Sequence, residues 1–140
     1  MSRDFSLDHR LDRDTILITS WPVNQVRLMD DCRFPWLVLV PERANMREPG
    51  DLCGNDQALL WSETLRASRA LAAVTAAEKM NLGQLGNVVP QLHVHVVARF
   101  SGDAAWPGPV WGHGTREPYA RGARGRLIER LRAEFARAGD

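Results

Sequence analysis

The sequence lacks the features of several large classes of protein. Only two of its 140 residues are cysteines, Cys32 and Cys53, and neither lies in a Cys-x-x-Cys pair or another zinc-binding spacing. The thiols are expected to be reduced, and a disulfide between them stays open as an alternative. No apolar run approaches the ~20 residues of a membrane-spanning helix, and the charged start has no secretory hydrophobic segment. We therefore expect a cytoplasmic protein that does not bind membranes.

Charge of one sign is also missing. The chain has 18 lysines and arginines against 17 aspartates and glutamates, so no overall field attracts nucleic acid or an anionic membrane. Any anion must therefore be bound locally. Since the length suits one domain and the chain has neither internal repeats nor a low-complexity linker, residues 1–140 are expected to form a single domain.

Short runs of β-branched and aliphatic residues predict the strands. A connection of only six residues joins the second strand to the third, and this predicts antiparallel pairing because a parallel crossover needs about a dozen residues or more. Alternation of polar and aliphatic residues predicts the last strand. The expected strands are 15–19, 25–29, 36–40, 80–83 and 91–99.

Three segments predict helices. A short amphipathic helix is expected at 4–13, capped by Ser2 or Asp4, a long Ala/Leu-rich helix at 56–79, and a C-terminal helix at 120–137. On the long helix, Trp61 is expected on the apolar face and Glu63 on the solvent side. Together the elements predict an α+β fold, in which an antiparallel sheet of about five strands carries the long helix on one face and the C-terminal helix at the periphery.

Two histidines on the last strand form the candidate site. Period-two geometry places Gln91, His93 and His95 on one face, where the two imidazoles can converge on one small group. They could bind a metal, but residues 96–99 supply no third ligand, and His113 lies in a loop without a metal-binding spacing. They could be hydrogen-bonded core residues. Alternatively, one imidazole could be a nucleophile that attacks phosphorus.

Residues 86–97, Gly-Asn-Val-Val-Pro-Gln-Leu-His-Val-His-Val-Val, resemble the signature of the histidine triad (HIT) family, with Gln91 at the position of the first histidine. Residues 28–41 are similar to the ribose-binding region of that family, and residues 106–108 resemble a Trp-Pro segment found after the triad. The resemblance implies a HIT-like fold with its core at about 15–110 and a C-terminal extension at about 111–140.

The resemblance implies a nucleotide hydrolase or transferase that acts at the α-phosphate of a dinucleoside polyphosphate, such as diadenosine tetraphosphate, or of a nucleoside phosphoramidate. His93 is implied to form a covalent nucleotidyl intermediate, and His95 to hydrogen-bond the phosphate oxygens or the leaving group. Gln91 is implied to orient His93 through its main-chain carbonyl. No cofactor is expected, although Mg²⁺ can accompany a polyphosphate substrate.

The resemblance also implies nucleotide-binding residues and a homodimer. Asn87 matches a position that contacts the phosphate, and Asp30 matches one that contacts the ribose hydroxyls. Asp30 is equally well read as a turn former. Arg99 could add charge at the strand end, and is equally well read as a member of a surface salt bridge. Two other functions stay open: a non-catalytic nucleotide-binding module, and a metal-dependent hydrolase built on the two histidines.

Overall fold

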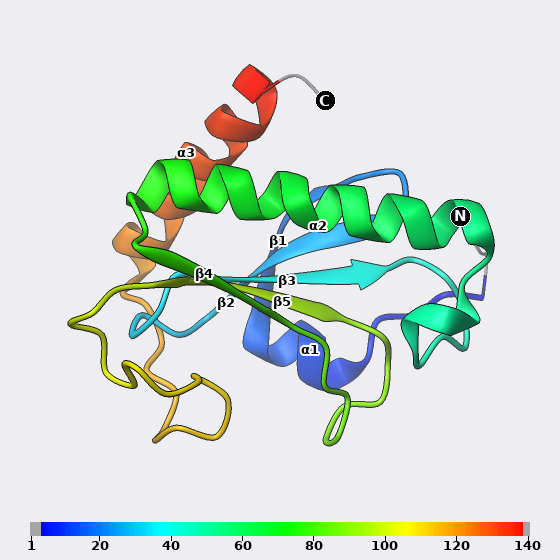
Figure 1. Cartoon of the computed structure of the whole chain (residues 1–140), viewed down its shortest axis with the longest axis horizontal. Coiled ribbons are helices and arrows are strands. Elements are labelled where there is room, and N and C mark those ends of the chain that lie inside the picture. Colours follow the sequence, from blue (N-terminus) through cyan, green and yellow to red (C-terminus); the bar gives the residue numbers. More distant parts are fainter. Residues whose placement is uncertain (1–3, 139–140) are drawn as a thin grey trace.

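Five antiparallel strands form the centre of the computed structural model, which describes residues 4–138 (Figure 1). The strands lie in the order β1-β2-β3-β5-β4, and each neighbouring pair runs antiparallel. This confirms the predicted α+β fold and its five-stranded antiparallel sheet. The strands are β1 (Thr15–Ser20), β2 (Asn24–Met29), β3 (Trp36–Pro41), β4 (Lys79–Gly83) and β5 (Val94–Arg99).

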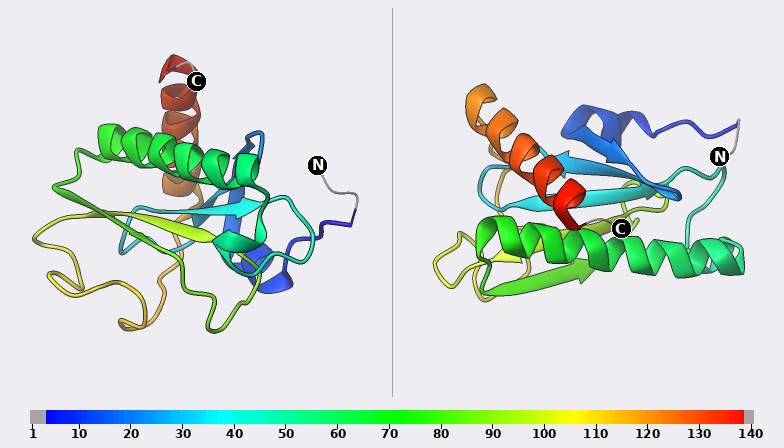
Figure 2. Two further views of the ribbon diagram at one scale, coloured as in Figure 1. Left: turned by 45° about the vertical axis from the view of Figure 1, so that its right-hand side comes forward. Right: turned by 90° about the horizontal axis from the view of Figure 1, so that it is seen from above.

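Two helices cover one face of the sheet and a third lies on the other. The long helix α2 (Gly54–Thr75) and the C-terminal helix α3 (Arg121–Ala138) lie side by side above the strands, and the short helix α1 (His9–Asp14) lies below them (Figures 1 and 2). A single 3-10 turn, η1 (Pro49–Asp51), precedes α2. Within residues 4–138, no helix combines the length and the apolar character needed to cross a membrane.

The alternation along β3 divides the core between the two faces. Leu37 and Leu39 are fully buried in a cluster that includes side chains of α2 and α3. Trp36, Val38 and Val40 point to the other face, where they pack with Leu11 of α1. Because a central strand buried on both sides needs apolar side chains at successive positions, the uninterrupted run at 36–40 suits this place in the sheet.

One helix start and one helix end that the sequence predicts need correction. The predicted helix at 4–13 begins only at His9, because the Asp8 carboxylate caps it by accepting the N–H of Arg10 at 2.8 Å. The predicted cap Ser2 lies outside the described residues, and Asp4 lies before the helix. Helix α2 ends at Thr75 rather than Lys79, because Ala76 adopts a left-handed conformation with φ of 56°.

The predicted faces of α2 are wrong at two positions. Trp61 is 58% exposed, whereas Glu63 is only 5% exposed. The Glu63 carboxylate accepts the Asn24 main-chain N–H at 3.1 Å and the Asn24 side-chain N–H at 2.8 Å. These bonds tie α2 to the start of β2 and compensate for the cost of burying the carboxylate.

The turn between β2 and β3 behaves as its polar residues suggest. The Asp31 carboxylate accepts the main-chain N–H of Arg33, two residues later, at 3.1 Å, which is the bond of an Asx turn. Cys32 in this turn and Cys53 before α2 are both free, exposed thiols. No disulfide therefore links the turn to α2.

Candidate functional site

The two histidines come together where the chain enters β5. The ladder begins at Val94 and not at Gln91, and the preceding segment is held by a hydrogen bond from the Leu92 N–H to the Met46 carbonyl at 2.9 Å. His95 lies opposite Val38 of β3, on the sheet face that carries α1. The imidazoles of His93 and His95 meet edge to face with their centroids 4.8 Å apart, and both are buried.

His93 has a tautomer fixed by the main chain. Its Nδ1 lies 2.6 Å from the Gln91 carbonyl oxygen. A carbonyl can only accept, so Nδ1 carries the proton and donates it. In the neutral ring Nε2 then keeps its lone pair. Nε2 is therefore the nucleophilic or proton-accepting atom of His93.

His95 has the opposite arrangement. The indole N–H of Trp36 donates to Nδ1 of His95 at 3.0 Å, and an indole nitrogen can only donate. Nδ1 of His95 is therefore an acceptor, and the proton of the neutral ring lies on Nε2. The two side chains belong to neighbouring strands and meet as a diagonal pair, because Trp36 lies opposite Val97 in the ladder.

Burial keeps both imidazoles neutral. It lowers the pKa of His93 below its ordinary value, while the hydrogen bond to the Gln91 carbonyl and the charge of Asp8 act in the other direction. Burial, reinforced by the neighbouring His93, lowers the pKa of His95 to about 3. At physiological pH the site therefore holds one free imidazole lone pair beside one imidazole N–H donor, without a charge on either ring.

A cavity of about 620 Å³ opens next to these rings. Its walls are mainly apolar and include the indoles of Trp36 and Trp111, both of which meet the His95 ring edge to face at 5.6 Å. A loop that contains Asn87 forms another side, and Gly86 in this loop has a φ of 80° that favours glycine. The lining residues are Arg10, Leu11, Asp14, Met29, Trp36, Leu85, Gly86, Asn87, Val88, Val89, His93, His95, Trp111 and Gly112.

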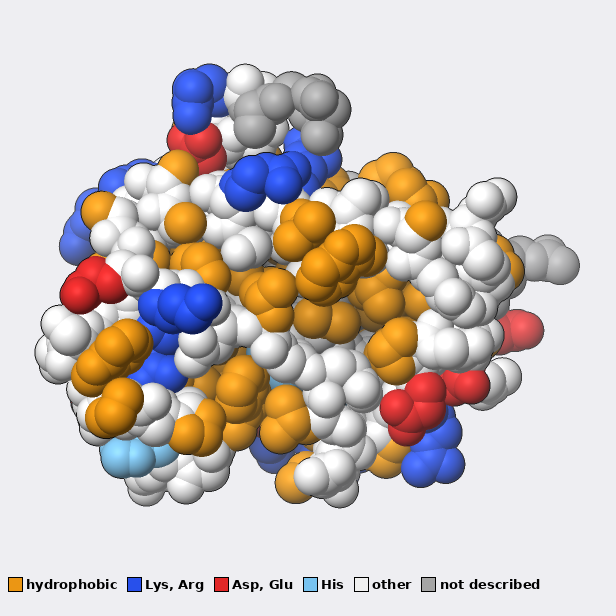
Figure 3. Space-filling view, viewed as in Figure 1, with side chains coloured by type: hydrophobic (Ala, Val, Ile, Leu, Met, Phe, Trp, Pro, Cys, Tyr) orange, Lys and Arg blue, Asp and Glu red, His pale blue; other side chains and the backbone are white. Residues whose placement is uncertain are grey.

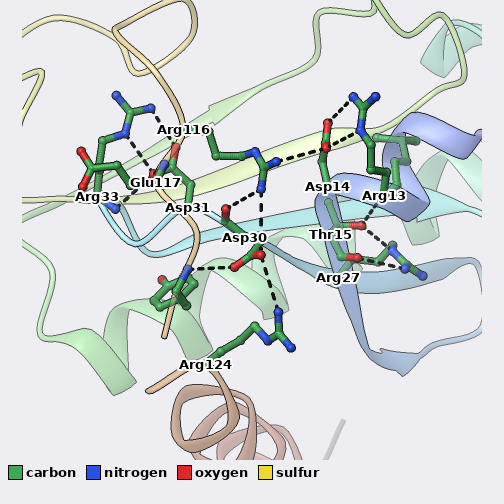
Figure 4. Close-up of polar contacts among 12 residues, drawn as sticks. Arg13, Asp14, Thr15, Arg27, Asp30, Asp31, Arg33, Arg116, Glu117 and Arg124 are labelled. Carbon is green, nitrogen blue, oxygen red and sulfur yellow. Dashed lines mark hydrogen bonds and ion pairs between the residues drawn. The ribbon is translucent and has the colours of Figure 1, made fainter. Parts of the chain in front are cut away.

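The structure places Asp30 outside this cavity. Its carboxylate accepts the Tyr119 main-chain N–H at 3.0 Å and lies 3.5 Å from the Arg124 guanidinium and 3.9 Å from that of Arg116 (Figure 4). Arg116 also reaches Asp14 at 3.6 Å. Asp30 thus fastens the segment before α3 to the β2–β3 turn, and the carboxylate that lines the cavity is that of Asp14.

Arg99 also lies away from the cavity. Its side chain is 1% exposed and forms a bidentate pair with Asp103 at 2.8 and 3.0 Å. Further N–H groups donate to the side-chain oxygen of Asn81 and to the carbonyl of Gly108, both at 2.8 Å. The guanidinium therefore organises the loop after β5. A salt bridge is present, as one alternative expected, but it is buried and does not lie on the surface.

Gln91 contributes to the site in two ways. Its main-chain carbonyl orients His93, as described above. Its side-chain amide points away from the histidines to the N-terminal segment, where it accepts the Asp8 N–H and donates to the Ser6 carbonyl, both at 2.8 Å. Of the six residues that the sequence singled out, the structure thus brings Asn87, His93 and His95 to one cavity, with Gln91 beside them.

Several cavity residues were not recognised from the sequence as site residues, among them Arg10, Trp36 and Trp111. Trp36 was expected only as part of a strand, and Trp111 only as part of the C-terminal extension. Their position depends on strand register and loop path, for which the sequence carries no local signal. Within residues 4–138 there is no group of three or more His, Cys, Asp or Glu side chains that could hold a metal ion.

A five-stranded antiparallel sheet with α2 and α3 on one face and a histidine pair on the other defines a HIT-like α+β fold, the fold of a nucleotide-binding and hydrolase family. The HIT domain family matches residues 12–102. The chain belongs to this family, whose members are generally nucleotide hydrolases or transferases, and membership of the family implies a nucleotide ligand.

Three solved histidine triad proteins resemble the whole chain. One from Sinorhizobium meliloti has 48% identity and a TM-score of 0.92, with 94% of this chain and 97% of that chain covered. One from Bradyrhizobium japonicum has 44% identity and a TM-score of 0.92 (94% and 98% covered). One from Marinobacter aquaeolei has 36% identity and a TM-score of 0.92 (95% and 97% covered). A search of curated proteins found no match.

Proposed function

We propose that the protein hydrolyses or transfers a nucleotidyl group by attack of His93 on the α-phosphorus of its substrate, with a covalent nucleotidyl-histidine intermediate. The substrate is a dinucleoside polyphosphate or a nucleoside phosphoramidate. The observation that carries the proposal is the pair of complementary tautomers, in which Nε2 of His93 is free to attack while Nε2–H of His95 is free to donate.

The first step forms one bond and breaks another. Nε2 of His93 donates its electron pair to the α-phosphorus, and the leaving group departs with the electron pair of its own bond to that phosphorus. A polyphosphate departs as an anion, whereas the nitrogen of a phosphoramidate takes up a proton from solvent as it departs. The Gln91 carbonyl stabilises the positive charge that the imidazole then acquires, because it accepts the Nδ1 proton throughout. In the second step water attacks phosphorus, His93 recovers its lone pair, and nucleoside monophosphate and a proton are released.

His95 and Asn87 have supporting roles in this scheme. The Nε2–H of His95 hydrogen-bonds a phosphoryl oxygen or the leaving atom as negative charge shifts onto it. Because the pKa of His95 is about 3, the ring acts as a neutral donor and not as an imidazolium. Asn87 lies in the loop that lines the cavity and offers an amide N–H to another phosphoryl oxygen.

Trapping the intermediate tests the proposal. The protein is mixed with diadenosine tetraphosphate or adenosine phosphoramidate, quenched, and analysed by mass spectrometry of its peptides. We expect one added AMP on the peptide that contains His93. His93→Ala should lower kcat/KM by at least ~1000-fold, which corresponds to about 4 kcal/mol of transition-state stabilisation. His113→Ala, which removes an exposed histidine outside the cavity, should stay within about twofold of the original chain.

Two results would contradict the covalent mechanism. One is turnover without an adduct under any quench time, together with a His93→Ala variant that keeps its rate. The other is tight nucleotide binding without turnover of either substrate, which would make the chain a nucleotide-binding module.

We also propose a homodimer formed through α2 and β4. β4 is an edge strand of the sheet, and an edge offers unpaired main-chain groups to a second chain. Hydrophobic side chains gather on the face that carries α2 and β4 (Figure 3), and Leu59, Trp61 and Leu82 are among the exposed large hydrophobic residues. Light scattering should give the mass of two chains, and Leu82→Asp should give that of one. Leu17→Asp, on the opposite edge strand, should leave the dimer intact.

A further inference from the structure

The side chain of Gln91 fastens the N-terminal segment to the residues just before β5. The Oε1 atom of Gln91 accepts the Asp8 N–H, and its Nε2–H donates to the Ser6 carbonyl, each at 2.8 Å, across 83 and 85 positions of sequence. In an extended chain the carbonyl of one residue and the N–H of the second residue after it face the same side. A planar amide carries an acceptor and a donor side by side, so it pairs with such a segment as a neighbouring strand does.

The fastened segment brings Arg10 to the cavity. The Asp8 carboxylate accepts Nε–H and Nη2–H of Arg10 at 3.1 and 2.9 Å, and the Val88 carbonyl accepts an Nη1–H at 3.0 Å. Among the described residues these bonds use three of the five guanidinium N–H groups. One N–H on each terminal nitrogen is left for a ligand, and the bonds to Asp8 and Val88 fix the direction of the group in advance.

Arg10 is the cationic side chain of the cavity. Of the described residues that line the cavity it is the only lysine or arginine, and both imidazoles are neutral. It lies at the loop of Asn87 and at Val88, whose 77% exposure marks the mouth. The apolar walls with Trp36 and Trp111 lie on the side of His95, and they suit a nucleoside.

We propose that Arg10 binds the phosphate groups of the leaving group and that Gln91 is the positioning residue that holds Arg10 in place, so that the preferred substrates are nucleotides whose leaving group carries phosphate. This inference rests on the proposed function for the identity of the reacting phosphorus. It gives the glutamine at the first triad position a task that a histidine performs less well, because the two ring nitrogens of an imidazole diverge and cannot both reach the Ser6 carbonyl and the Asp8 N–H.

Hydrolysis of two substrates separates this role from a general one. Attack on diadenosine tetraphosphate expels ATP, whereas attack on adenosine phosphoramidate expels ammonia, which carries no phosphate. Arg10→Gln should lower kcat/KM for diadenosine tetraphosphate by about 10- to 100-fold, the range for a charge-assisted hydrogen bond, and kcat/KM for the phosphoramidate by less than threefold. Arg10→Lys should recover part of the loss. Arg137→Gln, which removes an exposed arginine paired with Glu134 on α3, is the matched control and should change neither value.

Gln91→Leu removes both hydrogen bonds of the side-chain amide and keeps the main-chain carbonyl. It should shift the ratio of the two kcat/KM values in the same direction as Arg10→Gln, by about 5- to 30-fold. The double variant should have the same ratio of the two kcat/KM values as Arg10→Gln alone, because the two side chains act through one contact. A residue that merely stabilised the fold would lower both kcat/KM values together and leave their ratio unchanged.

Calorimetry of nucleotide binding tests Arg10 without turnover. In the His93→Ala background, Arg10→Gln should weaken the binding of diadenosine tetraphosphate by about 10- to 100-fold and the binding of AMP by less than threefold. Equal losses of affinity for the two nucleotides, or no loss of affinity for diadenosine tetraphosphate, would overturn the inference. If the original chain binds both nucleotides with this dependence on Arg10 but hydrolyses neither substrate, the proposed reaction fails while the Arg10 site stands.

Discussion

Trp36→Phe removes the hydrogen bond that fixes the His95 tautomer while keeping an aromatic ring in the core. In the original chain the indole N–H donates to Nδ1 of His95 at 3.0 Å, so the ring proton is held on Nε2, next to the cavity. Without this donor, His95 can place its proton on Nδ1 instead. Nε2 would then present a lone pair to the phosphoryl oxygens and repel them.

The size of the effect follows from burial. A neutral hydrogen bond contributes ~0.5–1.5 kcal/mol, and an acceptor left buried without a partner costs ~1–3 kcal/mol. His95 is only 6% exposed, so water does not readily replace the indole, and the upper range applies. About 2 kcal/mol lost in the transition state corresponds to a kcat about 30-fold lower.

Trp111→Phe is the matched control. Trp111 also lines the cavity, and its ring meets His95 at the same centroid distance of 5.6 Å. Within the described part of the chain, however, its buried indole nitrogen has no hydrogen-bond partner. Its replacement by phenylalanine therefore loses similar ring contact but no bond to His95. We expect a kcat within about threefold of the original and a change mainly in KM.

Two measurements check this reasoning. Steady-state hydrolysis with each variant gives kcat and KM, and nitrogen chemical shifts of the imidazoles report which ring nitrogen carries the proton. We expect protonated Nε2 on His95 in the original chain and in Trp111→Phe, and a mixture in Trp36→Phe. A protonated Nδ1 on His95 of the original chain would refute the tautomer assignment. An unchanged kcat in Trp36→Phe would refute its importance for the reaction.

Four further expectations concern pH, stability and the triad. Because burial lowers the pKa of His93, the acid limb of the pH profile of kcat/KM should have its midpoint below pH 6.5. The lone pair on Nε2 is free above the pKa of the folded chain and is lost as the pH drops through that pKa. His95 is protonated near pH 6.5 in the unfolded chain but only near pH 3 in the folded chain. The urea concentration at the unfolding midpoint should therefore decline as the pH falls from 6.5 to 3, and this decline should be less steep in His95→Asn. Glu63→Gln should lower the free energy of unfolding by about 1–3 kcal/mol, since a carboxylate that accepts several buried N–H groups is replaced by an amide; equal urea midpoints would contradict this. Gln91→His keeps the main-chain carbonyl, so phosphoramidate hydrolysis should stay within about threefold, and a severe loss would mean that the amide takes part in the chemistry itself.

Most of the fold could be predicted from the sequence because its elements have strong local patterns. The β-branched runs gave the strands at the N-terminal half to within one residue, and the apolar run at 36–40 had the composition of a central strand. The histidine pair was found because alternation alone places His93 and His95 on one face. The features predicted well are those that a residue and its near neighbours determine.

The errors arose where a distant residue decides the outcome. Glu63 was expected in solvent because charged residues on a helix usually are, but the N–H groups of the turn at Asn24, 39 residues away, bind it in the interior. The surroundings of Asp30, whose two expected roles the sequence left open, likewise depend on distant residues, because Tyr119, Arg116 and Arg124 engage its carboxylate. No periodicity of the local sequence encodes such contacts, and they depend on segments brought together by the fold.

The role proposed for Gln91 is one in which a departure from a motif adds a function rather than removing one. The part of this residue that serves His93 is its main-chain carbonyl, which every amino acid possesses, so the side chain at this position is free to change without loss of the nucleophile's tautomer. The glutamine amide uses this freedom to hold Ser6 and Asp8, and through them Arg10, against the cavity. In the proposed mechanism, chemistry at phosphorus and selection of the leaving group therefore depend on different atoms of this one residue. A variant at Gln91 should consequently alter which substrate is preferred before it alters whether catalysis occurs.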